Sequence, residues 1–332
     1  MSSLSNPPGS VPAISVVIPA HGRLHRLRVC LWALANADPP AGGFEVVVVD
    51  DGSPEPLEAA IADLCAALPL TLCRQSNAGP AAARNVGAQL AAAPLLAFTD
   101  DDCTPTSGWL RAMVDAAARD PDALLGGETI NGLPDNSFAE ASHMLGEYLQ
   151  VADSRQPPFF ASNNLAVPAE PFRALGGFDT SFSRPAGEDR DLCDRWAASG
   201  RPLRPAPDAV VLHHHELGMR SFWRQHHNYG RGAYRFHRNR AKRAGAGLRL
   251  APPMFYLGLL TRPLQRGDRR KASLVGLLAL TQVANAAGFA AEWLKSRRAP
   301  PPLSRSARAD ADRVTERADP LLAPLRPPSA SC

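Results

Sequence analysis

Short apolar runs alternate with helix-forming stretches through the first half of the chain. Four of the runs are rich in Val, Ile and Leu and predict strands: 15–18, 44–49, 70–72 and 95–99. The stretches between them predict helices: 26–35, 56–67 and 80–92. Nearly continuous apolar strands joined by helices are typical of a parallel sheet that is covered on both faces. The pattern therefore predicts an α/β fold with a mostly parallel central sheet.

The pattern is less regular in the middle of the chain. We expect a strand near 126–128, a turn at 176–179, a helix from 187 to about 199, and a strand at 209–212 that ends in His213-His214-His215. No GxGxxG segment follows the first strand, and no GxxxxGK[ST] segment occurs. The sequence therefore lacks the dinucleotide-binding fingerprint and the phosphate loop of P-loop enzymes.

Two of the predicted strands end on clustered acids. The second strand stops on Asp50-Asp51, and the fourth stops on the triplet 100–102, which is Asp-Asp-Asp. The carboxyl ends of strands in such a sheet meet at the ligand crevice, so both clusters are expected there. Adjacent carboxylates raise each other's pKa unless a cation joins them, and Mg²⁺ or Mn²⁺ suits such oxygen ligands. A strand-to-helix turn capped by Asp102 or Thr104 explains the triplet equally well.

Charge is distributed unevenly along a chain of ordinary globular composition. The net charge is only +4, yet residues 1–218 hold 14 Lys/Arg and 26 Asp/Glu, whereas residues 219–332 hold 22 Lys/Arg and 6 Asp/Glu. This asymmetry indicates an acidic catalytic part and a basic part that meets an anionic partner. The six cysteines form no CxxC pair, so neither a zinc site nor a disulfide framework is indicated, and reduced thiols in the cytosol fit best.

The basic part contains two unusual segments. Residues 220–240 interleave arginines with aromatic residues, and residues 272–291 carry no charge. The first segment predicts either a helix on an anionic membrane surface or a helix packed on the catalytic domain; no nucleic-acid recognition fold is visible there. The second has about the length of a bilayer span but no clean polar face, so it predicts a weak span or a buried helix.

These observations divide the chain into four parts. Residues 1–12 are expected to form a disordered leader, because they contain neither a basic n-region nor an apolar h-region. Residues 13–218 form the catalytic domain, and residues 219–298 form a basic, partly apolar helical appendage that is a candidate for membrane association. Residues 299–332 are rich in Pro, Ser, Arg and Ala and are expected to be a disordered tail.

Several short motifs in a fixed order resemble those of family 2 glycosyltransferases with the GT-A fold. Six segments carry the resemblance: VIPAHGR at 17–23, VVDDGS at 48–53, NAGPAAARN at 77–85, DDD at 100–102, GGFD at 176–179 and GED at 187–189. Each is weak alone, but their common order over residues 14–235 makes the resemblance specific. It implies a GT-A sheet of the Rossmann-like type and an enzyme that uses a nucleotide-diphosphate sugar.

The resemblance implies a donor site built from the first four of these six segments. Asp51 would contact the base or its ribose, and Pro19 with the following turn would line the base pocket. Arg84, at a helix start, would lie beside the diphosphate, although a surface salt bridge is the simpler interpretation of that residue alone. The full donor-binding set predicted on this basis is Pro19, Ala20, Arg23, Asp50, Asp51, Asn77, Arg84, Asp100 and Asp101.

The resemblance also implies a divalent cation, Mn²⁺ or Mg²⁺, held by the acidic triplet. In an extended segment Asp100 and Asp102 point to one side and serve as ligands, while Asp101 points away and is structural. One of the three histidines at 213–215 is expected to complete the shell; His213 is preferred, and the choice among them stays open. An imidazole ligand favours Mn²⁺ over Mg²⁺.

On the acceptor side, the resemblance implies that Asp189 is the general base and that Glu188 positions the acceptor or Asp189. Both residues also fit a simpler interpretation, as first-turn acids that the helix dipole favours. The acceptor-binding set predicted from the neighbouring motifs is Asn163, Asn164, Gly177, Phe178 and Asp179.

The sequence thus predicts an inverting, metal-dependent glycosyltransferase that uses a UDP-linked sugar at the cytoplasmic face of the membrane. Its acceptor is expected to be an envelope or lipid-linked glycan, on the evidence of the basic apolar appendage alone. Residues 222–232 lack the Q-x-x-R-W stretch of processive members, so transfer of one or a few sugars is expected. Two rivals are a catalytically silent scaffold that binds a glycan or nucleotide, and a sugar-1-phosphate nucleotidyltransferase, for which 21–23 is a poor phosphate loop.

Overall fold

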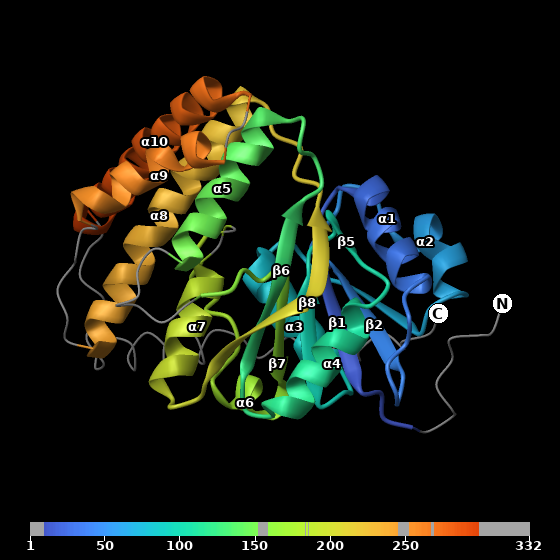
Figure 1. Ribbon diagram of the computed structural model, residues 1–332. Coiled ribbons are helices and arrows are strands. Elements are labelled where there is room, and N and C mark those ends of the chain that lie inside the picture. The colour runs from blue at the N-terminus through green and yellow to red at the C-terminus, as the bar shows by residue number, and fades with distance from the viewer. Residues whose placement is uncertain are drawn as a thin grey trace, which may run out of the picture.

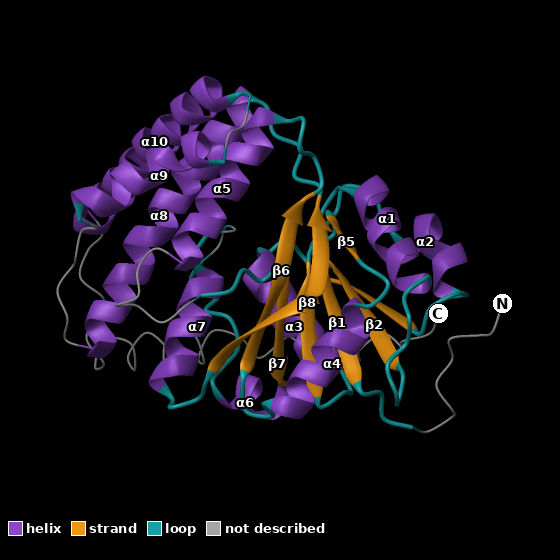
Figure 2. Ribbon diagram, in the orientation of Figure 1, coloured by secondary structure: helices purple, strands orange, loops and turns teal. Residues whose placement is uncertain are grey.

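An eight-stranded sheet forms the centre of the computed structural model, which describes residues 10–151, 159–182, 184, 186–244, 252–266 and 269–298 (Figures 1 and 2). The strands are β1 Ile14–Ala20, β2 Phe44–Asp50, β3 Leu70–Arg74, β4 Leu95–Thr99, β5 Cys103–Pro105, β6 Leu124–Asn131, β7 Asn164–Pro168 and β8 Leu203–His213. All four strands predicted in the first half are present. Residues 1–9 of the expected leader, and the whole expected tail, lie outside the described residues.

The strand order is β3-β2-β1-β4-β7-β6-β8-β5. The first four of these strands pair in parallel, and β6 pairs in parallel with β8. By contrast, β7 runs antiparallel between β4 and β6, and β5 runs antiparallel beside β8. The predicted mostly parallel α/β fold is therefore confirmed. The short strands β5 and β7 show no alternation that marks them in the sequence. Their formation depends on pairing with strands that lie far away along the chain.

Helices cover both faces of the sheet, and alternate residues of each strand point to opposite faces. One face carries α1 Leu24–Ala35, α2 Glu58–Cys65 and α4 Trp109–Arg119, which bury apolar side chains together with Val16, Ile18 and Val46. The other face carries α3 Pro80–Leu90, α6 Ala169–Ala174 and α7 Glu188–Ala198, which pack with Val17 and Val49. This double coverage explains why the first strands are nearly continuous apolar runs.

A separate helical bundle stands beside the sheet (Figure 1). It consists of α5 Ser137–Val151, α8 Met219–Ala244, α9 Pro253–Gln265 and α10 Lys271–Arg298. These helices enclose their own apolar core, which includes Met144, Phe222 and Leu278. The predicted boundary at residue 219 thus misses one member, because α5 comes from the middle of the chain and joins the bundle.

The arginine-rich helix α8 packs on its neighbours along much of its length. Phe222 and Phe236 are buried, whereas Trp223 and Tyr229 are each 38% exposed, and several of its arginines pair with acids on other helices. Arg231 and Arg235 both bond Glu292 of α10, each at 2.8 Å. For most of this segment, therefore, the structure supports the interpretation of a helix packed on the protein over that of a free anion-binding surface.

Helix α10 lies along α8 at very short range. A Cβ at Gly288 would lie 1.9 Å from the carbonyl oxygen of His227, and a Cβ at Gly230 would lie 1.9 Å from that of Asn285. Of the helices in the described residues, α10 is the one long and apolar enough to cross a bilayer, and 33% of its apolar window is buried inside the protein. The glycines show that its inner face is fitted to α8.

Replacing Gly288 by Ala should separate α8 from α10. The new Cβ meets backbone, which cannot move aside cheaply, so we expect the free energy of unfolding to fall by about 1–3 kcal/mol. Gly276→Ala is the matched control in the same helix, because nothing lies within 4 Å of a Cβ there; it should leave stability unchanged or raise it by ~1 kcal/mol. Thermal and denaturant unfolding of both variants tests this, and equal stability of the two would contradict the packing.

Candidate active site

The turn after β2 is held by Asp50, whose side chain is fully buried. Its Oδ1 accepts the Ser53 N–H at 2.8 Å, and its Oδ2 pairs with Arg74 at 2.9 Å. Arg74 also donates to the Ser53 carbonyl oxygen at 2.7 Å. Both carboxylate oxygens of Asp50 are thus used inside the protein. The prediction that Asp50 contacts a donor is therefore not supported, because the side chain forms the turn.

Asp51, the next residue, also uses its carboxylate for hydrogen bonds within the protein. Its carboxylate accepts the N–H groups of Ala78 at 2.8 Å and Gly79 at 2.9 Å, and the side chain of Gln75 donates to it at 2.7 Å. Its own N–H donates to the carbonyl oxygen of Ala20 at the end of β1. Asp51 therefore ties the ends of β1 and β2 to the segment that opens α3, and brings Pro19, Ala20 and Asn77 to one edge of the sheet.

The acidic triplet after β4 is a turn and not an extended segment. The Cys103 N–H donates to the Asp100 carbonyl oxygen at 3.0 Å, which closes the turn. The alternation predicted for the triplet is therefore wrong. Asp101 and Asp102 both pair with Arg23, whereas Asp100 faces Arg84 at 2.6 Å. Arg23, predicted to line the base pocket, thus lies against two of the acids.

Burial and charge act in opposite directions on these acids. Burial raises the pKa of Asp101 to about 7 despite the charge of Arg23. Burial would also raise the pKa of Asp102, but the hydrogen bond and charge of His213, together with Arg23, lower it below its usual value. Asp102 is consequently the acid of this pair that stays ionised at neutral pH.

Arg84 joins the acidic triplet to the start of α7. It lies in the first half of α3 and is only 3% exposed. One end of its guanidinium contacts Asp100 at 2.6 Å and the other contacts Glu188 at 3.2 Å. A buried guanidinium needs such partners, because an unpaired charge inside a protein is strongly unfavourable. The prediction that Arg84 belongs to the site, and not to a surface salt bridge, agrees with this placement.

Helix α7 begins with the two carboxylates expected to carry the chemistry. Gly187 precedes them with φ of 87°, a conformation that glycine adopts without strain. Burial and the charge of Asp189 raise the pKa of Glu188 to about 7 against the opposing charge of Arg84. Burial also raises the pKa of Asp189, against the hydrogen bond from the Arg190 N–H. Two adjacent carboxylates with raised pKa values indicate a site for proton transfer.

The histidines at the end of β8 differ in their surroundings. His213 Nε2 lies 3.4 Å from Asp102 Oδ1, and the rings of His213 and His215 are 5.0 Å apart, so these two histidines lie on the same side of the chain. Burial lowers the pKa of His213, but the hydrogen bond and charge of Asp102 together with the charge of Asp100 outweigh burial and raise it. The backbone N–H of His214 donates to the Asp102 carbonyl oxygen at 2.8 Å.

The donor atoms around Asp102 fit a divalent cation. Among the described residues, Asp102, Cys103 and His213 bring ligand-type atoms within 4.8 Å of one another. Asp102 Oδ1 is buried, and its contact in the described residues is the long one to His213 Nε2 at 3.4 Å, so both atoms are placed to bind one cation. Burial raises the pKa of Cys103 well above its usual value, so this thiol stays protonated and is a poor ligand. Asp100, also predicted as a ligand, faces Arg84 instead.

Two of the five predicted acceptor residues, Asn164 and Phe178, have side chains that pack inside the protein. The Asn164 side chain accepts from Trp109 Nε1 and donates to the Glu128 and Ala209 carbonyl oxygens. Phe178 is 1% exposed and packs on the ring of Phe98 at 5.1 Å. Neither side chain is available to a substrate, so these two predictions are wrong.

The other three predicted acceptor residues are more open or contribute backbone. Asn163 is 7% exposed, and its carbonyl oxygen accepts from Thr99 Oγ1. Gly177 has φ of 65°, and a Cβ there would lie 2.4 Å from Asn85 Oδ1. Asp179 bonds the Ser181 N–H at 2.9 Å and the Asn239 side chain at 3.1 Å. The segment 176–179 thus forms a wall that α3 and α8 hold in place.

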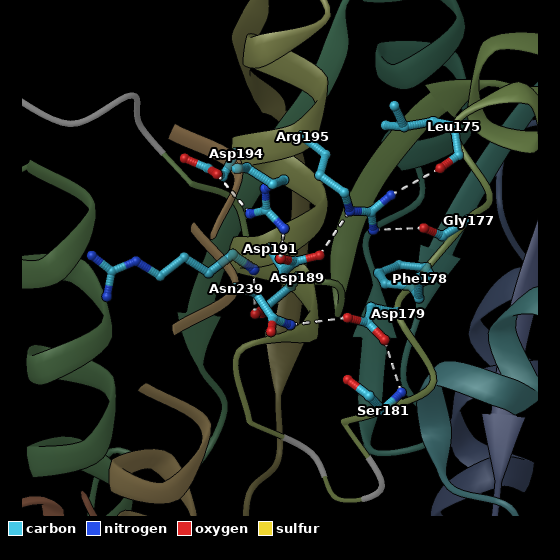
Figure 3. Close-up of polar contacts among 12 residues, drawn as sticks. Leu175, Gly177, Phe178, Asp179, Ser181, Asp189, Asp191, Asp194, Arg195 and Asn239 are labelled. Atoms are coloured by element: carbon cyan, nitrogen blue, oxygen red, sulfur yellow. Dashed lines mark hydrogen bonds and ion pairs between the residues drawn. The ribbon is translucent and has the colours of Figure 1, made fainter. Parts of the chain in front are cut away.

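A buried ion cluster fixes α7 against this wall, as Figure 3 shows. Asp191 is fully buried and accepts from Arg195 at 2.7 Å and from Arg243 of α8 at 2.8 Å. Arg195 then donates to the carbonyl oxygens of Leu175 at 3.1 Å and Gly177 at 2.7 Å. The Asp191 carboxylate therefore connects the bundle to the helix that carries Glu188 and Asp189.

Several site residues were missed by sequence reasoning. Arg74 ends β3 and Gln75 follows it, and a polar pair at the carboxyl end of a strand was the signal that could have found them. Cys103 directly follows the acidic triplet. Arg243 gave no signal, because it lies 52 positions away from its partner Asp191 along the chain.

Comparison with known proteins gives this geometry a context. The family model described as glycosyl transferase family 2 matches residues 15–176, a range that contains the Asp50–Asp51 turn, Arg84 and the acidic triplet. This chain belongs to glycosyl transferase family 2. The match ends before Glu188, so that model does not cover the start of α7.

Curated glycosyltransferases are also similar in sequence to this chain. The chain is 30% identical over 232 residues to a pre-mycofactocin glycosyltransferase of Mycobacterium tuberculosis, covering 66% of this chain and 46% of that protein. It is 32% identical over 224 residues to a validoxylamine A glucosyltransferase of Streptomyces hygroscopicus subsp. jinggangensis, covering 58% and 53%. This chain thus spans about half the length of these curated relatives.

A solved structure shares the fold. A mannosyltransferase from Pyrobaculum calidifontis, determined in complex with GDP-Man and Mn²⁺, superposes with a TM-score of 0.55 and 21% identity over 95% of this chain and 82% of that one. This likeness confirms the GT-A architecture predicted for the family 2 chain.

Proposed function

We propose that this chain transfers a glycosyl group from a nucleotide-diphosphate sugar to an acceptor hydroxyl, with inversion at the anomeric carbon. The observation that carries the proposal is the placement of Arg84, which contacts Asp100 on the donor side and Glu188 at the start of α7. One buried cation thereby connects the acidic triplet to the paired carboxylates. Family membership supports the reaction class.

The donor side of the proposed site is the edge of the sheet that Asp51 and Asn77 share with the acidic triplet. Asp102 and His213 would hold a divalent cation, Mn²⁺ better than Mg²⁺ because one ligand is an imidazole. Such a cation neutralises the diphosphate leaving group when it is bound. Arg84 adds a fixed positive charge at the same side of the crevice.

Asp189 is the proposed general base. Its carboxylate takes the proton of the acceptor hydroxyl as that oxygen forms a bond to the anomeric carbon, and the bond from that carbon to the diphosphate oxygen breaks. The leaving nucleoside diphosphate keeps the bonding electron pair. Glu188, held by Arg84 and by the Ala186 N–H at 2.8 Å, fixes the start of α7 so that Asp189 faces the acceptor. A single displacement with one base inverts the configuration.

The donor is proposed to be a UDP-sugar and the acceptor an envelope or lipid-linked glycan at the cytoplasmic face of the membrane. The five cysteines in the described residues are free, which fits a reducing compartment. Ionised Asp102 and the paired carboxylates of α7 favour an enzyme over the catalytically silent scaffold.

A panel of nucleotide sugars tests the proposal directly. The purified chain is mixed with UDP-, GDP- and TDP-linked sugars in the presence of Mn²⁺ or Mg²⁺, and release of nucleoside diphosphate is measured. We expect one donor class to be bound and slowly hydrolysed in a metal-dependent manner. If no nucleotide sugar is bound or hydrolysed with either metal, the proposed function is wrong.

The pH dependence of transfer should show an acid limb near pH 7. Glu188 faces Arg84 of α3, Asp189 of its own helix and Tyr229 of α8, and its pKa is raised to about 7. The pKa of Asp189 is raised as well, so the pair takes up a proton as the pH falls through this range and the base is lost. Transfer should therefore decline below about pH 7 and be constant above it.

Glu188→Gln provides the check on this assignment. It removes the neighbouring negative charge, so Asp189 ionises more readily and the acid limb of kcat/KM should move to lower pH. Glu140→Gln, a change of the same chemistry in helix α5, should leave the profile unmoved. An unchanged acid limb in Glu188→Gln would contradict the coupling of the two carboxylates.

A further inference from the structure

Helix α9 exposes large apolar side chains on its outer surface. Met254, Leu257 and Leu264 are 69%, 53% and 55% exposed, and their spacing places them on one face of the helix. Tyr256 stands beside them and is 38% exposed. The opposite side of α9 is buried through Leu259. This helix is therefore apolar towards the protein and also towards solvent.

Helix α10 packs against α9 and shows the same property. Its inner residues, such as Leu274, Leu278 and Thr281, are buried. Its outer surface carries Val283 at 58% exposure and Leu294 at 47%, which lie on one face because eleven residues are close to three helical turns. No charged residue occurs from 272 to 291. Figure 1 shows that α9 and α10 lie on the outer side of the bundle, away from the sheet.

The charges around this surface are almost all positive. Residues 252–298 contain eight Lys/Arg and two acids, Asp268 and Glu292. Glu292 is buried and already bonds Arg231 and Arg235, and Asp268 lies outside the described residues. Basic residues flank the apolar faces at both ends: Arg269 and Lys271 at one, and Lys295, Arg297 and Arg298 at the other. Arg266, near the first end, pairs with Glu147 of α5. Long basic side chains can lay their stems on apolar surface and keep their charge in water.

We propose that the outer faces of α9 and α10, termed the α9/α10 face, bind the surface of a bilayer that contains anionic lipids. Apolar side chains enter the boundary between headgroups and acyl chains, and the flanking Lys and Arg meet lipid phosphates. Trp293 and Tyr256, both partly exposed, suit the interfacial depth. The inference goes beyond the proposed function, since it rests on no residue of the active site.

Two other occupants fit the structure less well. If α10 spanned the membrane, it would have to leave α8, break the two ion pairs of Glu292 and expose the backbone contacts at Gly230 and Gly288. A second copy of this chain would bring two strongly basic rims together, and like charges repel. The surface of an anionic bilayer offers an apolar layer to the exposed apolar side chains and negative charge to the basic rim.

Vesicle flotation of the full chain tests the proposal. Phosphatidylcholine vesicles are compared with vesicles of phosphatidylcholine mixed with phosphatidylglycerol, and we expect binding to the mixed vesicles that weakens with added salt. Leu257→Gln and Leu264→Gln should each lower the partition coefficient about tenfold. Lys271→Gln and Lys295→Gln should each lower it about fivefold, on anionic vesicles alone.

Matched controls come from the catalytic domain. Leu90→Gln removes a leucine that is 47% exposed on α3, and Arg119→Gln removes one positive charge from the last turn of α4. Both should float as the unaltered chain does. Metal-dependent release of nucleoside diphosphate, measured on the same preparations, should be retained by every variant.

Four outcomes would overturn the proposal. They are absence of flotation, equal loss in the control variants, resistance of the bound chain to alkaline carbonate, which would show a span, and a dimer in sedimentation that the leucine variants dissociate. If the chain floats with vesicles but releases no nucleoside diphosphate from any donor, the proposed function is wrong and the proposal for the α9/α10 face stands. If it releases nucleoside diphosphate but does not float, the proposal for the α9/α10 face is wrong and the proposed function stands.

Discussion

Asp189→Asn should abolish most sugar transfer while leaving donor binding intact. The amide keeps the size and position of the side chain at the start of α7 but cannot accept the hydroxyl proton. Loss of a positioned general base lowers rates by roughly 10²–10⁴-fold. Asp189 is separated from the donor-side acids by Glu188 and Arg84, so the affinity for donor should not change. Transfer to acceptor and binding of donor are measured separately on the same protein.

Asp194→Asn is the matched control for this variant. It makes the same chemical change on the same helix, at a side chain that pairs with Arg240 and Arg243 away from the paired carboxylates. It should lose some stability through these ion pairs and keep its transfer rate per folded molecule. If Asp189→Asn transfers sugar as fast as the unaltered chain, a different residue must be the base.

Asp102→Ala should remove metal-dependent donor binding. Asp102 is the acid whose pKa is lowered, and its buried Oδ1 lies 3.4 Å from Nε2 of His213, the other proposed ligand. Changes next to a metal commonly lower its affinity 10- to 100-fold, and loss of a ligand should reach at least about 100-fold. Calorimetry or paramagnetic resonance of Mn²⁺ binding without any nucleotide measures this independently of catalysis.

Asp101→Asn separates the metal effect from a general effect on the triplet. Asp101 is fully buried and pairs with Arg23, but it is not part of the converging group formed by Asp102, Cys103 and His213. We expect this variant to bind Mn²⁺ within a few-fold of the unaltered chain and to unfold at lower temperature. Equal loss of Mn²⁺ affinity in both variants would argue that the triplet acts as one unit.

The structure also decides how Asp101 is held. Alternation in an extended segment made Asp101 structural, although the resemblance included it in the donor-binding set. The turn from Asp100 to Cys103 instead buries it completely against Arg23, because the chain reverses before β5. A three-residue acidic run does not reveal whether it is extended or turned, since that depends on β5 pairing with β8.

The sequence alone determined the presence of the first four strands, the acid clusters that end two of them, and the family through six short motifs. Those features depend on local periodicity and on residues adjacent in the chain. Only the tertiary structure decided that α5 joins α8, α9 and α10, that Asn164 and Phe178 are packing residues, and that Arg84 reaches both Asp100 and Glu188. Each of these contacts joins segments far apart in the chain, so its presence follows from which surfaces must be buried together and not from any local pattern.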